Sequence, residues 1–420
     1  MRITVIGAGS TYTPELVAGF ASRSDVLAVD ELVLHDIDAE RLEIVAGLAV
    51  RILAAQGYPG RVVTTTDLPR ALDGAAAVLV QLRVGGQQAR LKDETIPGKY
   101  RLIGQETTGP GGLAKALRTV PVVLDIAEQA VKHADPNSWI VDFTNPVGIV
   151  TRALLDHGHR AIGLCNVAIG FQRRFAQRFG VRPDQVELDH AGLNHLTWIR
   201  GVRVDGRELL PHILASDYAH ELAEEIGAPI ELMQLLQAIP SYYLHYFYCT
   251  DEVVAEQEHG GHRAEQVAAI ERELLAMYQD PTLDHKPELL EQRGGAYYSE
   301  AAAALVTSLL TGDGARHYVN VRNNGTIAGL TADDVVEVPA IVDRSGAHPV
   351  PVAPLRPELL GLVQAVTQYE QLAIEAAVTG DRRVTERAMI ANPLIRQWES
   401  IPNLTTDILA GSADYLPRFR

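Results

Sequence analysis

Short apolar runs alternate with amphipathic stretches along the first 165 residues of the chain. Each apolar run is long enough for one buried strand, and together they cover residues 3–6, 31–34, 62–65, 77–82, 139–142 and 161–164. Helix-like segments lie between them, including residues 14–22, 39–56 and 114–133. Buried strands that alternate with helices predict an α/β fold with a doubly wound, Rossmann-like parallel sheet.

The pattern changes beyond residue 165, where helical stretches dominate. They cover residues 218–226, 229–237, 263–278, 298–310, 356–379 and 383–391, with shorter β-like pieces near 187–189, 197–204, 318–320 and 335–340. Single cores stop growing near about 250–300 residues, so a longer chain is expected to form two domains. We predict a Rossmann-like domain over residues 1–165 and a mixed α+β, largely helical domain over residues 166–420. The two are expected to share a cleft.

Charge and cysteine content narrow the class of protein. The formal net charge of -16 disfavours nucleic acid and anionic membranes as partners, and an anionic ligand must be held by locally placed Arg or Lys. Two cysteines, Cys165 and Cys249, are too few for a disulfide framework and indicate a reducing compartment. The N-terminus lacks signal-peptide features, and no apolar run approaches the ~18 residues of a membrane span. We therefore expect a cytoplasmic enzyme.

A glycine turn follows the first predicted strand. Gly7-Ala8-Gly9-Ser10-Thr11 suits the turn that brings a pyrophosphate to a helix N-terminus. Tyr12 stands where a third glycine is usual, so an ordinary strand-to-helix turn remains open. Asp36 ends the second strand, where a carboxylate binds ribose hydroxyls and favours NAD over NADP, although nearby Arg41 leaves some doubt. Candidate cofactor-binding residues are Gly7, Gly9, Ser10, Thr11, Asp36, Arg41 and Arg83.

Two further segments carry ligand-type residues. The loop at 104–112, GQETTGPGG, combines four glycines with a carboxylate and hydroxyls, which suggests backbone held against a ligand. An ordinary surface loop is the alternative. The segment at 142–146, DFTNP, follows a predicted strand, and Asn145 would lie at the carboxyl edge of the sheet, where ligands bind. Asn145 is therefore a plausible sugar contact.

Cys165, His195 and Tyr243 are ambiguous when each is taken alone. A single cysteine or histidine in an apolar setting is more often a packed residue than a metal ligand, and their spacing is no metal motif. The segment 241–248 holds four tyrosines and fits an aromatic patch as well as a site. A tyrosine base would need a nearby cation, because the phenol pKa is ordinarily about 10.

The ordered set of motifs resembles glycoside hydrolase family 4, and is similar to its 6-phospho-β-glucosidase branch, almost from end to end. The segments that carry the resemblance are GAGS at 7–10, TTD at 65–67, GQETTGPGG at 104–112, DFTNP at 142–146, GLCN at 163–166, GLNHLTW at 192–198, YLHYF at 243–247, RGGAYYSEAA at 293–302 and VRNNG at 321–325. Asp142 is a departure, because Asn is commoner there, and it could alter contacts near the sugar.

The resemblance implies a role for each candidate residue. Cys165 and His195 would bind a divalent metal, usually manganese, and Tyr243 would be the catalytic base. The implied substrate contacts are Arg90, Asn145, Asn166 and Arg263, with the two arginines on a 6-phosphate and Arg83 and Arg293 as weaker candidates. Asn166 replaces the Asp that follows Cys in α-specific branches, which favours a β-linked substrate.

The implied reaction is hydrolysis of 6-phospho-β-glucosides with NAD and a divalent metal, by transient oxidation at C3, removal of the C2 proton, elimination and water addition. The implied partner is a small phosphosugar, and the implied assembly is a homodimer or homotetramer. A family member acting on a 6-phospho-α-glucoside, galactoside or galacturonide stays open. So does a simple NAD-dependent hydroxy-acid dehydrogenase that shares the first domain.

Overall fold

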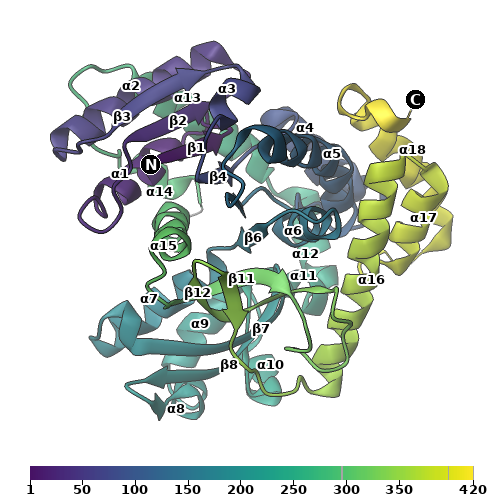
Figure 1. The fold of residues 1–420 in the computed structure, drawn as a ribbon. Helices are drawn as coiled ribbons and strands as arrows, with labels where there is room; N and C mark the ends of the chain where they lie inside the picture. The colour runs from purple at the N-terminus through teal and green to yellow at the C-terminus, as the bar shows by residue number, and fades with distance from the viewer. Residues whose placement is uncertain (295–296, 396, 420) are drawn as a thin grey trace.

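The computed structural model describes residues 1–294, 297–395 and 397–419, so Gly295 and Ala296 of the RGGAYYSEAA segment lie outside the described residues. Thirteen strands of the described chain form one mixed sheet, drawn in Figure 1. The strand order along its main path is β10-β8-β7-β12-β11-β6-β5-β4-β1-β2-β3.

One half of the sheet is parallel throughout. Its strands are β1 (Arg2–Ile6), β2 (Glu31–His35), β3 (Arg61–Thr65), β4 (Ala77–Val80), β5 (Trp139–Asp142) and β6 (Ala161–Leu164). They run in the order 3-2-1-4-5-6, which is typical of dinucleotide-binding domains. The predicted Rossmann-like sheet is therefore confirmed. The strand predicted over 77–82 ends at Val80, because Gln81 and Leu82 turn toward the cleft described below.

The other half of the sheet is antiparallel and continues directly from β6. Its strands are β7 (Val186–Leu193), β8 (Leu196–Val204), β9 (Arg207–Glu208), β10 (Ile239–Pro240), β11 (Ala315–Arg322), β12 (Val335–Asp343) and β13 (Gly346–Pro349). Strand β11 pairs with β6 on one side and with β12 on the other. The strands of the predicted second domain thus extend the sheet of the first one.

Seven helices among the described residues up to 179 connect and cover the parallel strands. They are α1 (Thr13–Ala21), α2 (Ala39–Ala55), α3 (Leu68–Leu72), α4 (Gly86–Thr95), α5 (Gly109–His133), α6 (Val147–Asp156) and α7 (Val167–Phe179). A 3₁₀ helix, η1 (Pro97–Tyr100), follows α4. The long helix α5 is almost wholly buried in its first three turns, which fixes the loop that precedes it.

The remaining helices come from the second part of the chain. They are α8 (Leu210–Leu214), α9 (Tyr218–Ile226), α10 (Ile230–Leu236), α11 (His245–Tyr248), α12 (Thr250–His259), α13 (Arg263–Tyr278), α14 (Leu289–Gln292), α15 (Tyr298–Thr311), α16 (Pro357–Thr379), α17 (Arg382–Ala391) and α18 (Ile401–Gly411), with the 3₁₀ helices η2 (Pro183–Gln185), η3 (Tyr242–Leu244), η4 (Trp398–Ser400), η5 (Ala413–Tyr415) and η6 (Pro417–Phe419). Helices α16 to α18, yellow in Figure 1, line one side of the molecule.

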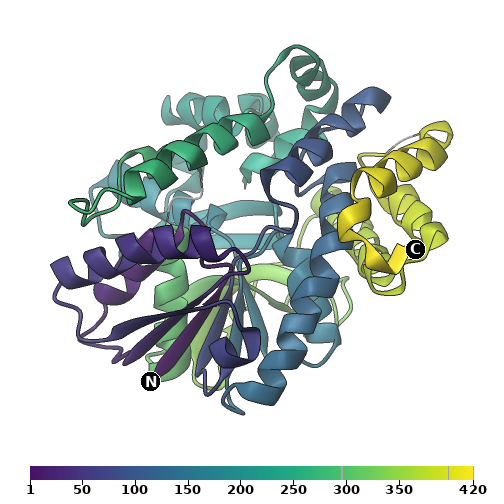
Figure 2. The ribbon, with the colours of Figure 1, turned by 90° about the horizontal axis from the view of Figure 1, so that it is seen from above.

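Helix α13 reaches back over the first part of the chain. It lies beside α2 in Figure 2, and an apolar cluster of Val45, Leu48 and Ile52 with Leu274 and Tyr278 joins the two helices. This packing holds α13 over the carboxyl ends of the parallel strands, so both parts of the chain contribute walls to one cleft. In the described ranges, no helix is long and apolar enough to cross a membrane.

Candidate active site

A cleft with a volume of about 1270 Å³ lies at the carboxyl edge of the parallel sheet. Residues that follow β1, β2, β4, β5 and β6 line one wall, and residues of η3, α13 and α15 line the other. The predicted site residues among them are Gly7, Gly9, Ser10, Asp36, Arg41, Arg83, Arg90, Asn145, Asn166, Tyr243 and Arg263. The fold therefore brings together side chains from positions more than two hundred residues apart, as expected at the edge of such a sheet.

The glycine turn and Asp36 form one end of the cleft. Gly7 has a left-handed φ of 84°, and a Cβ there would lie 2.7 Å from the Gln81 carbonyl oxygen, so only glycine fits. The Gly9 N–H donates to Asp36 Oδ2 at 2.7 Å. Arg41 donates to the Gly9 carbonyl oxygen at 2.6 Å and lies 3.5 Å from a carboxylate oxygen of Glu271. A ribose bound at this end of the cleft would thus meet the Asp36 carboxylate. It would also meet Arg41, which already forms an ion pair with Glu271.

Thr11 lies apart from the other residues of this turn. It is fully buried, its carbonyl oxygen accepts a hydrogen bond from the Tyr278 hydroxyl at 2.7 Å, and it is not among the residues that line the cleft. Thr11 anchors the start of α1 to α13, and its predicted contact with a cofactor has no support in this geometry.

A buried carboxylate, Glu106, organises the cations in the middle of the cleft. It accepts hydrogen bonds from Arg83 and, at 2.5 Å, from Lys115, and Arg90 Nη1 lies 3.3 Å away. Burial raises the pKa of Glu106, but Arg83, Lys115 and Arg90 outweigh it and hold the pKa well below its usual value. Glu106 therefore stays ionised and holds Arg83, Arg90 and Lys115 in fixed positions, although burial and Arg83 lower the pKa of Lys115 to about 7.

The two arginines predicted to bind phosphate have different surroundings. Arg90 is largely buried and donates to Glu94 at 2.7 Å, besides facing Glu106. Arg263, at the start of α13, is exposed and donates to Gln266 and to the Gln292 carbonyl oxygen. Arg263 can thus reorient toward a ligand with little cost, whereas Arg90 is held in place by acids.

The glycines of the 104–112 loop have a structural cause. A Cβ on Gly111 would lie 2.3 Å from the Gln105 carbonyl oxygen, and one on Gly112 would lie 2.5 Å from the Thr107 carbonyl carbon. Neither glycine lines the large cleft. Packing against protein backbone therefore explains glycine at these two positions, and the expectation that this loop is held against a ligand stays a prediction. Within this loop only Glu106 lines the large cleft.

Tyr243 lies between the cleft and the two predicted metal ligands. Its ring stacks on the His195 imidazole, with centroids 3.5 Å apart and planes 7° from parallel. Burial raises the pKa of Tyr243 well above its usual value, and Cys165 raises it further, while Arg90 opposes them. A phenolate at this position therefore requires an additional cation.

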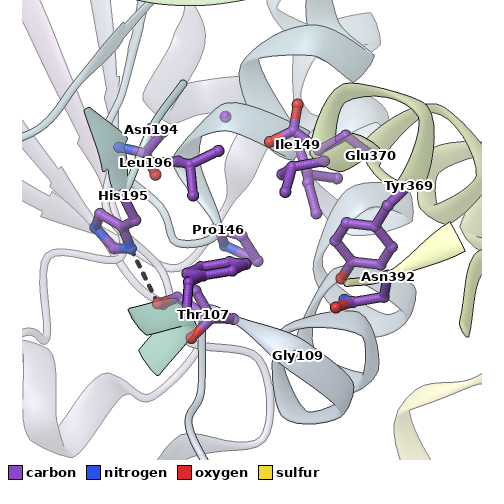
Figure 3. Close-up of a pocket in the computed structure, with 14 residues that line it drawn as sticks. Thr107, Gly109, Pro146, Ile149, Asn194, His195, Leu196, Tyr369, Glu370 and Asn392 are labelled. Atoms are coloured by element: carbon purple, nitrogen blue, oxygen red, sulfur yellow. Dashed lines mark hydrogen bonds between the residues drawn. The ribbon is translucent and has the colours of Figure 1, made fainter. Parts of the chain in front are cut away.

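His195 is presented by a tight turn between β7 and β8. Leu193 pairs with Leu196, and His195 between them has a φ of 60°, which is uncommon for any residue except glycine. Its Nδ1 atom lies 3.0 Å from Thr107 Oγ1, the dashed line in Figure 3. Burial lowers the pKa of His195 to about 4, so its ring is neutral near pH 7 and its Nε2 can serve as a ligand.

Cys165 lies beneath the cleft surface and is 2% exposed. Burial raises the pKa of its thiol, and the charge of Glu337 raises it further, while hydrogen bonds with Tyr298 and Asn194 oppose both. A thiolate there would need a cation as partner. One sulfur and one imidazole nitrogen beside Tyr243 fit a borderline divalent metal, whose other ligands would come from substrate or water. No group of three or more His, Cys, Asp or Glu residues that could hold a metal occurs among the described residues.

Asp142 does not take part in the cleft surface. It is fully buried, and its Oδ1 accepts a hydrogen bond from the Thr144 N–H at 3.0 Å. Burial raises its pKa well above the usual value, which favours the protonated acid. Its predicted effect on the sugar could therefore only be indirect, through Thr144 and the loop that carries Asn145.

Several cleft residues were not singled out from the sequence. Lys115 belongs to a helix that looks merely amphipathic, and Glu271 lies on α13 at a position without a local motif. Tyr298 belongs to a quoted segment but had no assigned role, although it lines the cleft and touches Cys165. Only Lys115 could have been found from the sequence, because a charged residue inside a largely apolar helix indicates a buried polar contact.

Comparisons with known proteins agree with this architecture. The model described as "Family 4 glycosyl hydrolase" matches residues 2–181, and that of the "Family 4 glycosyl hydrolase C-terminal domain" matches residues 190–395. A protein of Bacillus subtilis described as "Probable 6-phospho-beta-glucosidase" is 42% identical over 433 residues, which cover 100% of this chain and 98% of the relative.

Solved structures are similar over the whole chain. A 6-phospho-β-glucosidase from Thermotoga maritima has a TM-score of 0.93 at 36% identity, with 99% of each chain covered. A second structure of the Thermotoga enzyme, with manganese, NAD⁺ and glucose-6-phosphate, has a TM-score of 0.91 at 35% identity, again with 99% of each chain covered. The family models and these relatives span the chain from end to end, so it belongs to family 4 of the glycosyl hydrolases.

Proposed function

We propose that the chain hydrolyses 6-phospho-β-glucosides in the large cleft, by transient oxidation of the sugar at C3 and elimination of the aglycone. One observation carries the proposal: a dinucleotide-type turn, a tyrosine flanked by a thiol and an imidazole, and two arginines converge on a single cleft. The relatives supply the substrate class, since the Bacillus subtilis and Thermotoga maritima proteins are named as 6-phospho-β-glucosidases.

The cleft offers a place for each group that the reaction needs. When bound, NAD⁺ would accept a hydride from C3, and a divalent metal such as Mn²⁺ would act as a Lewis acid on the oxygen of that carbon. The backbone of the Gly7–Ser10 turn and Asp36 would hold the dinucleotide. Cys165 and His195 would hold the metal. Arg90 and Arg263 would anchor the 6-phosphate by charge-assisted hydrogen bonds.

Tyr243 would move the proton that makes elimination possible. Oxidation at C3 acidifies the C2 proton, and a cation at Cys165 and His195 would lower the Tyr243 pKa enough for the phenolate to remove it. The C1–O bond would then break, and the aglycone would leave as its anion and take a proton from water. Water would add at C1 while Tyr243 returns a proton to C2, and the C3 ketone would be reduced back to the alcohol. The net reaction is hydrolysis with the cofactor unchanged.

Asn166 supports a β-linked substrate. It lines the cleft at the start of α7, directly after Cys165. An amide cannot protonate a leaving group, whereas a carboxylic acid at this position could do so. The proposal therefore places Asn166 as a hydrogen-bonding contact to the sugar and assigns it no acid role.

The test is release of p-nitrophenol from its 6-phospho-β-glucoside, with NAD⁺, Mn²⁺ and reductant all present or omitted one at a time. We expect release that stops without NAD⁺ or without metal, with no lasting NADH absorbance. The 6-phospho-α-glucoside and the unphosphorylated β-glucoside are expected to be poor substrates. Steady accumulation of NADH would instead identify a dehydrogenase, and release without NAD⁺ would refute the redox route.

A further inference from the structure

A buried acid stands behind the proposed metal site in the antiparallel half of the sheet. Glu337 lies in β12, and its side chain is 1% exposed. Its neighbours along the strand are Val336 and Val338, both fully buried. The proposed reaction gives Glu337 no role, and a buried carboxylate is costly unless its surroundings compensate it.

Sheet pairing places Glu337 in one row with three other positions. Glu337 is paired with Gly192 of β7 on one side and with Asn320 of β11 on the other, and Asn320 is paired with Gly163 of β6. Glycine is required at Gly163, where a Cβ would lie 2.9 Å from the Cβ of Asn320. Gly163 thus leaves room for the Asn320 side chain, whereas a Cβ at Gly192 would meet the Leu196 carbonyl oxygen.

Three side chains donate to the Glu337 carboxylate. His190 Nε2 lies 2.8 Å from Oε1, and the amides of Asn194 and Asn320 donate to Oε2 at 3.0 and 3.1 Å. Burial raises the pKa of Glu337, but the His190 hydrogen bond and charge, with the Asn194 hydrogen bond, hold the pKa below its usual value. Glu337 is therefore a fixed negative charge inside the sheet.

Asn194 connects this charge to both proposed metal ligands. It precedes His195 in the turn between β7 and β8, and its side chain donates to Glu337 Oε2 at 3.0 Å and lies beside the Cys165 thiol. Figure 3 shows Asn194 and His195 side by side at this turn.

We propose that Glu337 is the positioning residue of the metal site: it orients Asn194, and through it Cys165 and His195, and it supplies a second negative charge behind them. The inference rests on the proposed function, because that function assigns Cys165 and His195 as the metal ligands. Partners behind metal ligands typically change metal affinity by about 10–100-fold when they are removed.

The test uses Co²⁺ alone as the probe, added without oxygen to the metal-free full chain. Charge-transfer absorbance from a Co²⁺–thiolate bond reports binding at Cys165 independently of catalysis. We expect Glu337→Gln, which keeps size but removes charge, to weaken Co²⁺ binding by about 10–100-fold. Glu337→Asp, which keeps the charge but shortens its reach, should lie between this variant and the wild type. NADH binding should be the same in all of them.

Glu370→Gln controls for exchanging a buried glutamate for its amide where no charge is lost, because burial raises the pKa of Glu370 to about 8. Glu370 is a second buried glutamate, on α16, in the small cavity that His195 also lines, but it has no contact with Asn194 through a hydrogen bond. Its replacement should leave Co²⁺ affinity within about twofold of the wild type, far less than the loss expected at Glu337.

Each outcome decides the inference. Unchanged Co²⁺ affinity in Glu337→Gln would overturn it while leaving the metal site standing. A wild-type chain that gives no Co²⁺–thiolate absorbance would overturn the metal assignment itself, and with it this inference and the proposed function. If Glu337→Gln fails to bind NADH because it does not fold, Glu337→Asp decides. Weaker Co²⁺ binding by a folded Glu337→Asp supports the positioning role, and unchanged binding overturns it.

Discussion

Glu370 allows a test of how burial changes the pKa of an acidic side chain and, through it, the stability of the fold. It lies on α16, is 4% exposed, and its Oε2 has no hydrogen-bond partner in the part of the chain that the structure describes. It borders a cavity of about 30 Å³ shown in Figure 3, beside Tyr369 and Asn392. Burial raises the pKa of Glu370 from 4.5 to about 8; Arg152 opposes the rise and Asp334 adds to it. The folded protein therefore holds this group protonated near pH 7.

The sign of the effect on stability follows from this raised pKa. A group with a higher pKa in the folded state stabilises the fold fully below its unfolded pKa of 4.5, and this stabilisation is lost as pH rises toward about 8. The interval is about 3.5 pH units, and each unit corresponds to about 1.4 kcal/mol. Between pH 5 and pH 8 the wild type should therefore lose about 3–4 kcal/mol of unfolding free energy through this one group.

Glu370→Gln removes the titrating proton and keeps the shape of the side chain. The variant should become more stable relative to the wild type as pH rises, by about 3–4 kcal/mol between pH 5 and pH 8. Urea unfolding followed by circular dichroism at fixed protein concentration, at four pH values in this range, measures the difference. Glu375→Gln on the same helix is the control, because Glu375 is exposed and its replacement should give a small difference that hardly changes with pH. A difference between Glu370→Gln and wild type that stays constant across the range would refute the reasoning.

Three further predictions concern the cleft. Tyr243→Phe should lower kcat for p-nitrophenyl 6-phospho-β-glucoside by about 10²–10⁴-fold with unchanged NADH binding, because it removes a positioned base; unchanged kcat would exclude that role. Arg263→Ala should raise KM about 10–100-fold, because it removes a charged hydrogen bond to the phosphate. Arg272→Ala on the same helix is the control and should leave KM unchanged; equal effects of the two variants would contradict the role of Arg263. Asp36→Ala should raise the Kd of NAD⁺ in a fluorescence titration while the Kd of NADP⁺ does not rise; a parallel rise in both would remove Asp36 from ribose recognition.

The parallel half of the fold could be predicted almost strand by strand. Apart from the edge strand β3, its strands are buried on both faces, so Val, Ile and Leu form continuous runs that end at polar or turn residues, as after Ile6 and at His35. The single continuous sheet could not be predicted, because the β6–β11 contact joins residues far apart in the sequence. Nothing local at Val319 or Asn320 indicates pairing with Leu164 and Gly163.

The site was predicted more unevenly than the fold. The glycine turn and Asp36 have a known spacing, so their common place in the cleft follows from the fold. The stacking of Tyr243 on His195 depends on the turn at residues 194–195 and has no local signal. Glu337 stands inside an apolar strand, and Glu370 inside an amphipathic helix. In both cases the sequence shows an acidic residue inside an element that is otherwise expected to be buried. The partners of that residue are set by tertiary packing and have no local pattern.

The central claim is that Tyr243 removes the proton on C2 after transient oxidation of C3, in a cleft that also holds the cofactor and the metal. Turnover of a 6-phospho-β-glucoside in deuterated water, followed by mass spectrometry or NMR of the sugar product, tests it most directly. The account predicts one deuterium at C2 of glucose-6-phosphate, in wild type but not in residual product from Tyr243→Phe. A wild-type product that carries only the original hydrogen at C2 would contradict the account, because hydrolysis would then proceed without breaking that bond.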